Sequence, residues 1–203
     1  MDWLTTLKSC GVSSGIAASW TPIFQAHCRP ERFSLGRAEM DDWLGQVLHE
    51  SAMLTRLVEN LSYSAHRMMT VWPKRFPTLV SAQPLAFNPE ALANSVYAGR
   101  MGNTRPGDGW LYKGRGLVMV TGRDNYTALG RVMGLPLDTQ PELLEVPEHA
   151  LLAAIVWWEQ HVPDAFINDP VKVRRAVNGG TVGLDETTRL AKLADGNGDG
   201  ALG

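Results

Sequence analysis

Two glutamates, Glu50 and Glu59, are the residues of this chain whose spacing best suits acid–base chemistry. Just before Glu50, apolar residues recur at helical spacing, at Trp43, Leu44, Val47 and Leu48. This pattern predicts a helix in which the Glu50 carboxyl leans towards the buried side. The glutamates are nine residues apart. Because that separation spans about two and a half helical turns, or ~13 Å, their carboxyls would face apart in one unbroken helix.

We therefore expect the chain to break between residues 51 and 55, so that the two carboxyls can flank a cleft. Such a pair suits the hydrolysis of a glycosidic bond with inversion. One carboxylic acid protonates the leaving oxygen, while a carboxylate roughly 6.5 to 9.5 Å away activates a water on the other face of the sugar. The sequence therefore indicates acid–base hydrolysis of a glycosidic bond.

The elements that must position these residues are predicted to be mainly helices. Three pairs of a capping residue and a proline predict helix starts, at Thr21-Pro22, Asn88-Pro89 and Asp169-Pro170. Helical patterns also cover residues 2–9, 35–49, 62–72, 147–161 and 184–194. The glycine-rich segment 103–122, interrupted by Pro106, predicts a long loop or a small irregular hairpin. Long structured loops of this kind are often functional.

Length and composition limit the possible classes of protein. The 203 residues suit one domain over residues 1–195, with residues 1–40 as its N-terminal helical part and a flexible glycine-rich tail over 196–203. The net charge of −2 and the absence of a Lys/Arg run argue against nucleic-acid binding. We also expect a monomer.

Cysteine usage and hydropathy carry further expectations. Cys10 and Cys28 lack a Cys-x-x-Cys spacing and are predicted to be reduced core thiols. The most apolar stretch, Ala150 to Trp158, is too short to span a membrane, so no stable membrane insertion is expected. The N-terminus does not look like a secretory signal, which predicts that the protein first accumulates in the cytoplasm. We expect no cofactor and no bound metal.

Several local motifs are better explained without chemistry. His49-Glu50 has no second histidine for a zinc helix, and Gly11 to Gly15 has no preceding strand for a nucleophile elbow. Asp195 to Gly200 resembles the first half of a calcium loop, but the chain ends before the twelfth-position glutamate. Trp157 and Trp158 are adjacent on a predicted helix, so at least one should lie in the core.

Four ordered motifs carry a family resemblance: His49-Glu50 with Glu59-Asn60, then Asn88 to Arg100, then Gly107 to Gly116 with Thr121 to Tyr126, and finally Val177 to Gly180. Together they resemble the family 19 glycoside hydrolases, most closely the bacterial and bacteriophage endolysins. The resemblance covers residues 41–190. It implies a mainly helical, lysozyme-like fold with two lobes and a central cleft. It also implies cleavage of β-1,4 bonds in chitin or peptidoglycan with inversion.

The resemblance assigns the reacting groups by position. Glu50 matches the general acid and Glu59 the general base, while Thr121 matches the hydroxyl residue that helps the base to hold the attacking water. A hydroxyl suits this role because it accepts a hydrogen bond from the water while donating its own proton elsewhere. Without the family context, Thr121 would equally suit a turn.

The same resemblance assigns five substrate-binding residues: Tyr112, Arg115, Asn125, Tyr126 and Asn178. The two asparagine amides can read an acetamido group, although either residue can also cap a turn or helix. The tyrosine rings can lie against sugar faces, but buried tyrosines usually only pack. The guanidinium of Arg115 is expected to brace the glycine loop or to pair with a catalytic carboxylate.

Two positions depart from the family pattern. Met119 stands where the family usually has glutamine, which removes an amide from the floor of the expected cleft. Thr187 stands where the family tends to have arginine, and a small shift in register would bring Arg189 to that place. Both departures concern substrate contacts more than the two glutamates.

The sequence therefore predicts an endolysin-type hydrolase of peptidoglycan, from a phage or prophage, that reaches the periplasmic wall through a separate membrane pore protein. A chitinase would share all of these residues. A lytic transglycosylase needs only one catalytic acid and no water, so Glu59 and Thr121 argue against it. A non-catalytic glycan-binding protein would fit Met119, and a purely structural role would leave the motif at Gly107 to Gly116 unexplained.

Overall fold

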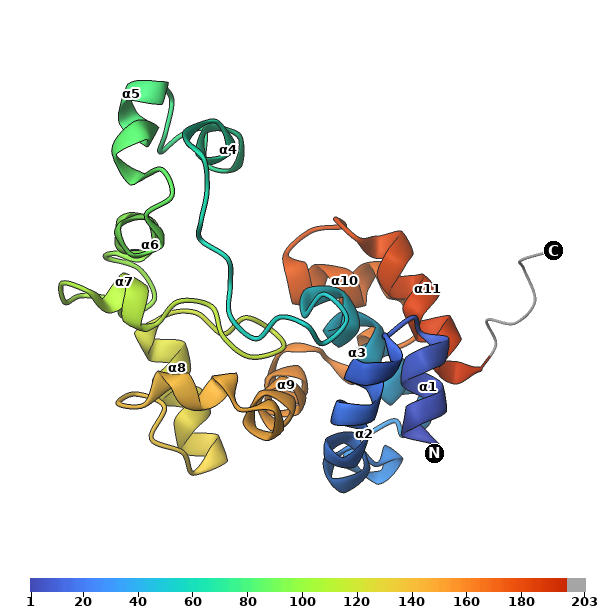
Figure 1. Ribbon diagram of the computed structural model, residues 1–203. Coiled ribbons are helices and arrows are strands. Elements are labelled where there is room, and N and C mark those ends of the chain that lie inside the picture. The colour runs from blue at the N-terminus through green and yellow to red at the C-terminus, as the bar shows by residue number, and fades with distance from the viewer. Residues whose placement is uncertain (197–203) are drawn as a thin grey trace. The chain divides into compact units, whose positions relative to one another are not determined.

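The computed structural model describes residues 1–196, which form two compact units whose regular secondary structure is almost all helical (Figure 1). The first unit contains residues 1–57, 116–118 and 143–196 of the described chain. The second unit contains residues 58–115 and 119–142. The mainly α fold class predicted from the sequence is confirmed. The assignment of one domain to residues 1–195 stays a prediction.

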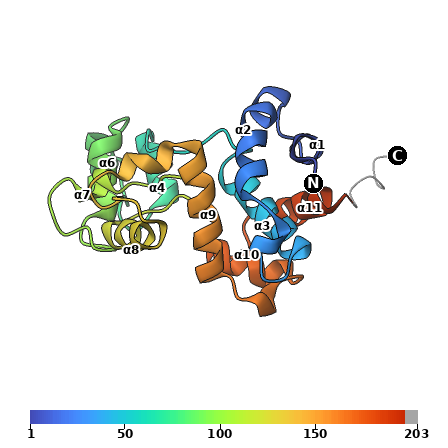
Figure 2. The same cartoon turned by 90° about the horizontal axis from the view of Figure 1, so that it is seen from below.

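The first unit is built from six helices: α1 (Trp3–Ser9), α2 (Ser14–His27), α3 (Arg37–Glu50), α9 (Pro147–His161), α10 (Pro170–Asn178) and α11 (Leu184–Asp195). Short 3-10 turns occupy Pro30–Arg32 and Asp164–Phe166. In Figure 2, α11 passes beside α1 and α3, and it packs against both. The α3–α11 crossing is close because residue 45 is glycine: a Cβ there would stand 2.6 Å from the Thr187 carbonyl oxygen.

Helix α3 is anchored to α9 by a buried polar contact. The Trp158 indole N–H donates to Glu39 Oε1 at 2.8 Å, and the other carboxylate oxygen accepts from the Leu35 N–H at 2.9 Å. Burying Glu39 is tolerable because both oxygens are hydrogen-bonded. Trp158 is 1% exposed, which confirms that one residue of the tryptophan pair lies in the core.

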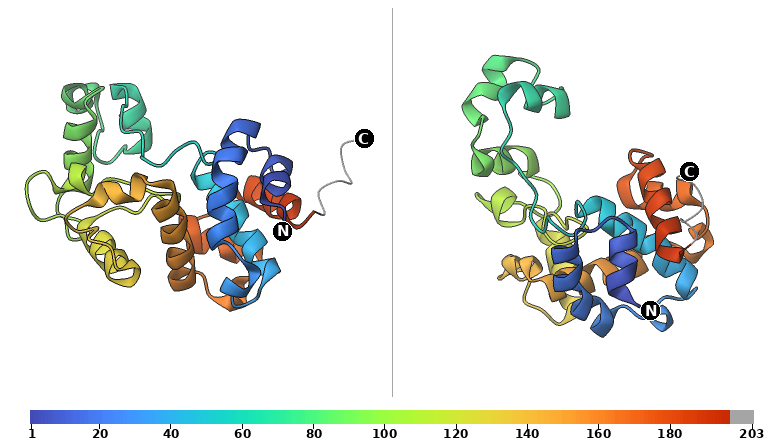
Figure 3. Two further views of the ribbon diagram at one scale, coloured as in Figure 1. Left: turned by 60° about the horizontal axis from the view of Figure 1, so that its bottom comes forward. Right: turned by 45° about the vertical axis from the view of Figure 1, so that its right-hand side comes forward.

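The second unit is built from α4 (Ala65–Val71), α5 (Leu79–Ala82), α6 (Pro89–Tyr97), α7 (Asp108–Leu111) and α8 (Arg123–Met133), with a 3-10 turn at Gln83–Leu85. A further turn, Pro141–Glu145, runs from this unit into the first. Helices α4 and α5 lie side by side in Figure 3 and share a small apolar core with α6. Isolated antiparallel bridges join Arg115 to Val58 and to Val120. Segment 103–122 is thus a loop with one short helix and a minimal hairpin.

Most of the predicted helix starts are confirmed. Asn88 Oδ1 accepts from the Ala91 N–H and Asp169 Oδ1 from the Lys172 N–H, each at 3.1 Å. The prediction of a helix start at Thr21-Pro22 is wrong, because Pro22 lies inside α2. Three core side chains, Ala17, Trp20 and Phe24, recur at helical spacing across the proline. Their burial outweighs the loss of one backbone hydrogen bond.

Other expectations concern thiols, membranes and the tail. Cys10 and Cys28 are both buried and free, as predicted, and burial raises the pKa of the Cys10 thiol to about 11. No helix within residues 1–196 has the length and apolar character needed to cross a bilayer. The expected flexible tail, 196–203, and the calcium-loop pattern, Asp195 to Gly200, fall mostly on residues 197–203, which lie outside the described part of the chain.

Candidate active site

The chain breaks at the predicted place, immediately after Glu50. Helix α3 ends at Glu50, and the next residues form a left-handed turn, with φ of 50° at Ala52, 59° at Met53 and 64° at Leu54. This backbone is unfavourable by about 1–2 kcal/mol per residue. The turn is held by the buried Ser51 hydroxyl, which donates to the Val47 carbonyl at 2.7 Å and accepts from the Leu54 N–H at 2.9 Å. Glu50 is therefore fixed at a rigid helix end.

Glu50 is paired with a buried arginine of the first unit. Arg174 Nη1 lies 2.6 Å from Glu50 Oε1 and 2.9 Å from Gln46 Oε1, while its Nε donates to the Val182 carbonyl at 2.6 Å. The Arg174 side chain is 1% exposed and that of Glu50 25%. The guanidinium is thus locked in place, whereas the carboxyl keeps a face open to solvent. We call Glu50, Gln46 and Arg174 the Glu50 site.

The second predicted carboxylate is held by neutral donors of the second unit. Glu59 Oε1 accepts from the Gly114 N–H at 2.5 Å, and Oε2 accepts from the Tyr97 hydroxyl at 2.7 Å. The Glu59 N–H also donates to the Gly114 carbonyl at 3.0 Å, which fixes the backbone. Each carboxylate oxygen keeps a further lone pair for another donor. We call Glu59, Tyr97 and Gly114 the Glu59 site.

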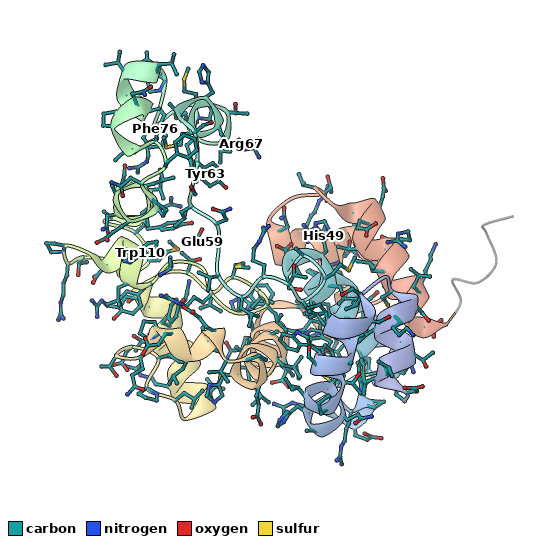
Figure 4. The ribbon with its side chains drawn as sticks, viewed as in Figure 1. His49, Glu59, Tyr63, Arg67, Phe76 and Trp110 are labelled. Atoms are coloured by element: carbon teal, nitrogen blue, oxygen red, sulfur yellow. The ribbon has the colours of Figure 1, made fainter. Side chains whose placement is uncertain are left out.

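Both partners of Glu59 are suited to their positions. Burial, followed by the negative charge of Glu59, raises the pKa of Tyr97 well above its ordinary value of 10, so the phenol stays protonated and keeps donating. Residue 114 must be small: a Cβ there would stand 3.2 Å from Glu59 Cδ and 3.3 Å from Oε1. Figure 4 shows Glu59 on the extended segment that leads to α4.

Side-chain hydrogen bonds hold the glycine loop around Gly114 in place. Arg115 Nη1 donates to the Leu111 carbonyl at 2.7 Å, and the Tyr126 hydroxyl donates to the Lys113 carbonyl at 2.6 Å. The Arg115 guanidinium also reaches the Tyr126 hydroxyl at 3.3 Å. These bonds fix the peptide whose N–H holds Glu59. Bracing of the loop by Arg115 is one of the two roles expected from the sequence.

Tyr112 and Tyr126 require a correction as sugar-stacking residues. They are 1% and 0% exposed, and their rings pack edge to face with centroids 5.5 Å apart. The Tyr112 hydroxyl donates to the Asp138 carbonyl at 2.6 Å. Because neither ring offers a free face, we reassign both tyrosines as positioning residues behind the glycine loop.

A partly buried ion pair lies against Tyr112. The Arg123 guanidinium lies 4.5 Å from the Tyr112 ring centroid and pairs with Asp108. Burial acts to raise the pKa of Asp108, but hydrogen bonds from the Arg123 side chain and the Arg105 N–H lower it overall. The pair therefore stays charged and ties α7 to α8.

Thr121 precedes α8, and Asn125 lies in the first turn of that helix. The Thr121 hydroxyl donates to the Met119 carbonyl at 2.9 Å, so its lone pairs remain available to accept from another donor. Asn125 is exposed, and its Nδ2 donates to the Thr121 carbonyl at 2.7 Å, leaving Oδ1 directed elsewhere. Met119 has a left-handed backbone with φ of 51°, which fits its place in the tight hairpin turn. The roles of Thr121 and Asn125 stay predictions.

Asn178 is the last residue of α10, and Gly179 with φ of 74° ends that helix. Its side chain is exposed, and its role as a sugar ligand stays a prediction. The suggested register shift for Arg189 is not supported, because this exposed guanidinium pairs with Glu186 at 2.8 Å. Thr187 is 1% exposed at the close α3–α11 crossing, where an arginine would not fit.

Sequence reasoning missed two residues, Arg174 and Tyr97. Arg174 precedes the matched Asn178 by four residues, on the same helix, and lies 124 residues from Glu50. Tyr97 falls inside the matched segment Asn88 to Arg100, so its place in a motif was a usable signal. No group of three His, Cys, Asp or Glu side chains within residues 1–196 is arranged to hold a metal.

The fold is shared with solved chitinases. A bacterial family 19 chitinase matches with a TM-score of 0.56 and 19% identity, covering 95% of this chain and 93% of that one. A class IV family 19 chitinase from Zea mays matches with a TM-score of 0.52 and 16% identity, covering 95% and 79%. The architecture is thus that of the helical, lysozyme-like glycosidases.

Sequence comparison then fixes the family. No protein-family model matches the chain. A glycosyl hydrolase family 19 domain-containing protein of Haemophilus influenzae is 38% identical over 150 residues, covering 73% of this chain and 74% of that protein. An endochitinase of Arabidopsis thaliana is 34% identical over 70 residues, covering 34% of this chain and 25% of that protein. The chain belongs to the family 19 glycoside hydrolases, and it is a glycoside hydrolase.

Proposed function

We propose that this enzyme hydrolyses the β-1,4 bonds of peptidoglycan glycan chains by inversion, with Glu50 as general acid and Glu59 as general base. The observation that carries the assignment is the different hydrogen bonding of the two glutamates. Glu50 is held by a permanent cation, and Glu59 by a phenol and a backbone N–H. The cation can stabilise the carboxylate left on Glu50 after proton donation, and the neutral donors hold the Glu59 carboxylate in a fixed direction.

The acid step begins with Glu50 protonated. Its proton passes to the glycosidic oxygen as the bond to the anomeric carbon breaks, which leaves a carboxylate 2.6 Å from the Arg174 guanidinium. Because the cation stabilises the charge that forms on Glu50, it lowers the free energy of the transferred-proton state. Gln46 and the Val182 carbonyl hold the guanidinium in place throughout.

The base step uses Glu59 as a carboxylate. A water attacks the anomeric carbon from the opposite face and gives one proton to Glu59. The Tyr97 hydroxyl and the Gly114 N–H fix both oxygens, so the remaining lone pairs keep a constant direction. Thr121 donates to the Met119 carbonyl, and we assign its oxygen to accept the other hydrogen of the water. Asn125 and Asn178 are assigned to the N-acetyl groups.

The proposal includes an endolysin role, in which the enzyme degrades the bacterial wall after release through a membrane pore protein and so lyses the host. It is supported by the four ordered motifs that resemble bacterial and bacteriophage endolysins. The second candidate is a chitinase acting on N-acetylglucosamine polymers. It is favoured by the solved neighbours, which are described as family 19 chitinases.

Digestion of purified peptidoglycan and of chitin oligosaccharides in H₂¹⁸O, followed by mass spectrometry, tests the proposal. Peptidoglycan products carrying one ¹⁸O at the reducing end are expected from the native enzyme and not from Glu50→Gln. Anhydro products without the label would identify a lytic transglycosylase instead. Cleavage of chitin alone would make the enzyme a chitinase, and binding without cleavage of either glycan would overturn the catalytic assignment.

A further inference from the structure

One segment of the second unit has cations but no carboxylates. Residues 60–89, which directly follow Glu59, contain no Asp or Glu, and they carry Arg67, Lys74 and Arg75. The segment includes α4, α5 and the 3-10 turn before α6. Figure 4 shows Glu59, Tyr63 and Arg67 in succession along the extended chain and the first turn of α4. We call residues 60–89 the cationic segment.

The cationic side chains of this segment are exposed and make few interactions with the rest of the described chain. Arg67 and Lys74 are exposed, and neither side chain makes an ion pair within the described residues. The Arg75 guanidinium donates to the Ser95 carbonyl but is also exposed. Exposed cations without internal partners are available for an anionic ligand.

The segment is a folded platform. Its buried side chains form an apolar core with those of α6, namely Leu61, Ala65, Met68, Phe76, Ala82, Leu92, Ala93 and Val96. The Phe87 N–H donates to the Tyr63 carbonyl at 2.9 Å, which closes the segment on itself. The positive charges are therefore carried on a fixed surface that begins one residue after Glu59.

The second unit as a whole is also positively charged. The second unit has nine Lys and Arg against six Asp and Glu, whereas the first has ten against fifteen. A chain with a net charge of only −2 is therefore divided into a basic and an acidic part. The positive charge of the second unit favours the binding of an anionic ligand there.

We propose that the cationic segment binds the carboxylates of the peptides attached to the peptidoglycan glycan, and so favours peptidoglycan over chitin. The inference rests on the proposed function, since the sugar backbone would be cleaved by Glu50 and Glu59. Chitin carries no charge, so exposed cations gain nothing from it. In peptidoglycan, peptide carboxylates are attached beside the glycosidic bonds that would be cleaved. The cationic segment begins at residue 60, directly after the proposed base Glu59, and we expect it to meet these carboxylates.

The experiment compares kcat/KM on peptidoglycan with kcat/KM on chitin oligosaccharides for the full-length enzyme. The test variant is Arg67→Gln with Lys74→Gln. Its matched control is Arg105→Gln with Arg131→Gln, which removes two exposed cations of the same unit outside the segment. A third substrate is peptidoglycan whose amines have been acetylated and whose carboxyls have been amidated. Thermal unfolding of all the variants monitors folding.

The ratio of the two kcat/KM values should fall about tenfold in the test variant and stay within twofold in the control. Amidation of the carboxyls should lower the native ratio by a similar factor, and added salt should reduce it. An unchanged ratio would overturn this inference while leaving glycan hydrolysis intact, and absence of all cleavage would instead overturn the proposed function.

Because Val80 and Phe87 are 85% and 69% exposed, vesicles of anionic phospholipid are included. Charge-dependent vesicle binding without a change in the ratio would assign the segment to a membrane surface.

Discussion

The Glu50 and Glu59 sites hold chemically identical side chains by different means. Glu50 lies at a helix end and is paired with the buried Arg174, whose guanidinium donates three hydrogen bonds. Glu59 lies on extended chain and is held by the neutral donors of Tyr97 and Gly114. The first site depends on charge balance, and the second on the geometry of a loop. Substitutions at the two sites should therefore fail in different ways.

The largest effect should come from the glutamates themselves. Glu50→Gln and Glu59→Gln should each lower kcat by about 10³-fold, because each removes one proton transfer. Their stabilities should differ. Glu50→Gln leaves the Arg174 cation without its counter-charge and should cost about 1 kcal/mol. Glu59→Gln should be nearly neutral, because the Tyr97 hydroxyl can rotate to accept from the new amide. Urea unfolding measures the difference, and equal losses would contradict the comparison.

Arg174→Leu should damage both stability and activity. The change removes the counter-charge of Glu50 and leaves Gln46 Oε1 and the Val182 carbonyl without their donor. We expect a loss of about 3 kcal/mol and a fall in kcat of about 100-fold. The matched control is Arg189→Gln, because Arg189 forms an exposed pair with Glu186. That control should lose less than about 0.5 kcal/mol. Comparable losses in the two variants would mean that the Arg174 contacts contribute little.

Gly114→Ala should displace the base with little cost to the fold. The new Cβ would stand 3.2 Å from Glu59 Cδ, so the carboxylate must move by a few tenths of an ångström. We expect kcat to fall about 30-fold while the free energy of unfolding changes by less than about 1 kcal/mol. Gly15→Ala is the control, because its Cβ would meet no atom within 4 Å. Unchanged turnover in Gly114→Ala would show that the Glu59 position tolerates movement.

Tyr97→Phe should lower kcat about tenfold, because one orienting donor to Glu59 is lost. Since burial and the Glu59 charge hold the Tyr97 pKa above 10, the phenol does not ionise between pH 5 and pH 10. The alkaline side of the pH–activity profile should therefore be the same in the variant. Tyr63→Phe provides the control. A profile that loses its alkaline side only in Tyr97→Phe would show that Tyr97 titrates in the native enzyme.

The smallest effect on turnover is expected from the last prediction, which concerns the pH dependence of stability in the first unit. Burial raises the pKa of Asp41 from its ordinary 3.8 to about 6, although Arg37 acts to lower it. The folded protein therefore keeps this proton between pH 4 and pH 6, where the unfolded chain has lost it. The resulting stabilisation is fully present below about pH 4 and is lost as the pH rises through 6. Relative to Asp41→Asn, the native protein should lose about 2 kcal/mol across that window. Asp185→Asn, an exposed change on α11 that keeps Asp41, should follow the native protein across the same window.

The features that could be predicted from the sequence are those that depend on a few neighbouring residues. The end of α3, the break after Glu50 and the caps at Asn88 and Asp169 all follow from spacing and capping chemistry over a few residues. Helix α2 was misread because the Thr21-Pro22 pair is a local signal, whereas the burial of Trp20 and Phe24 is a tertiary effect. Helix α8 is absent from the sequence prediction; like α3 and α11 it begins after a glycine without a capping side chain, so capping chemistry does not explain the omission.

The environments of the two glutamates could not be predicted in the same way. The Glu50–Arg174 contact joins residues 124 apart, and the Glu59–Tyr97 contact joins residues 38 apart. No periodicity connects positions at such distances. Tyr112 and Tyr126 were misassigned for a related reason: a tyrosine in a motif can stack on a sugar or pack in the core, and only burial decides between them.

The central claim is that two carboxyl groups act as acid and base, so that the sugar is attacked by water with inversion. The most direct test is ¹H NMR of the anomeric protons during the first minutes of digestion of a soluble glycan that the enzyme cleaves. The account predicts that the α-anomer appears first and then equilibrates. Initial formation of the β-anomer would contradict it, because retention requires a nucleophile in place of the water that Glu59 is proposed to activate.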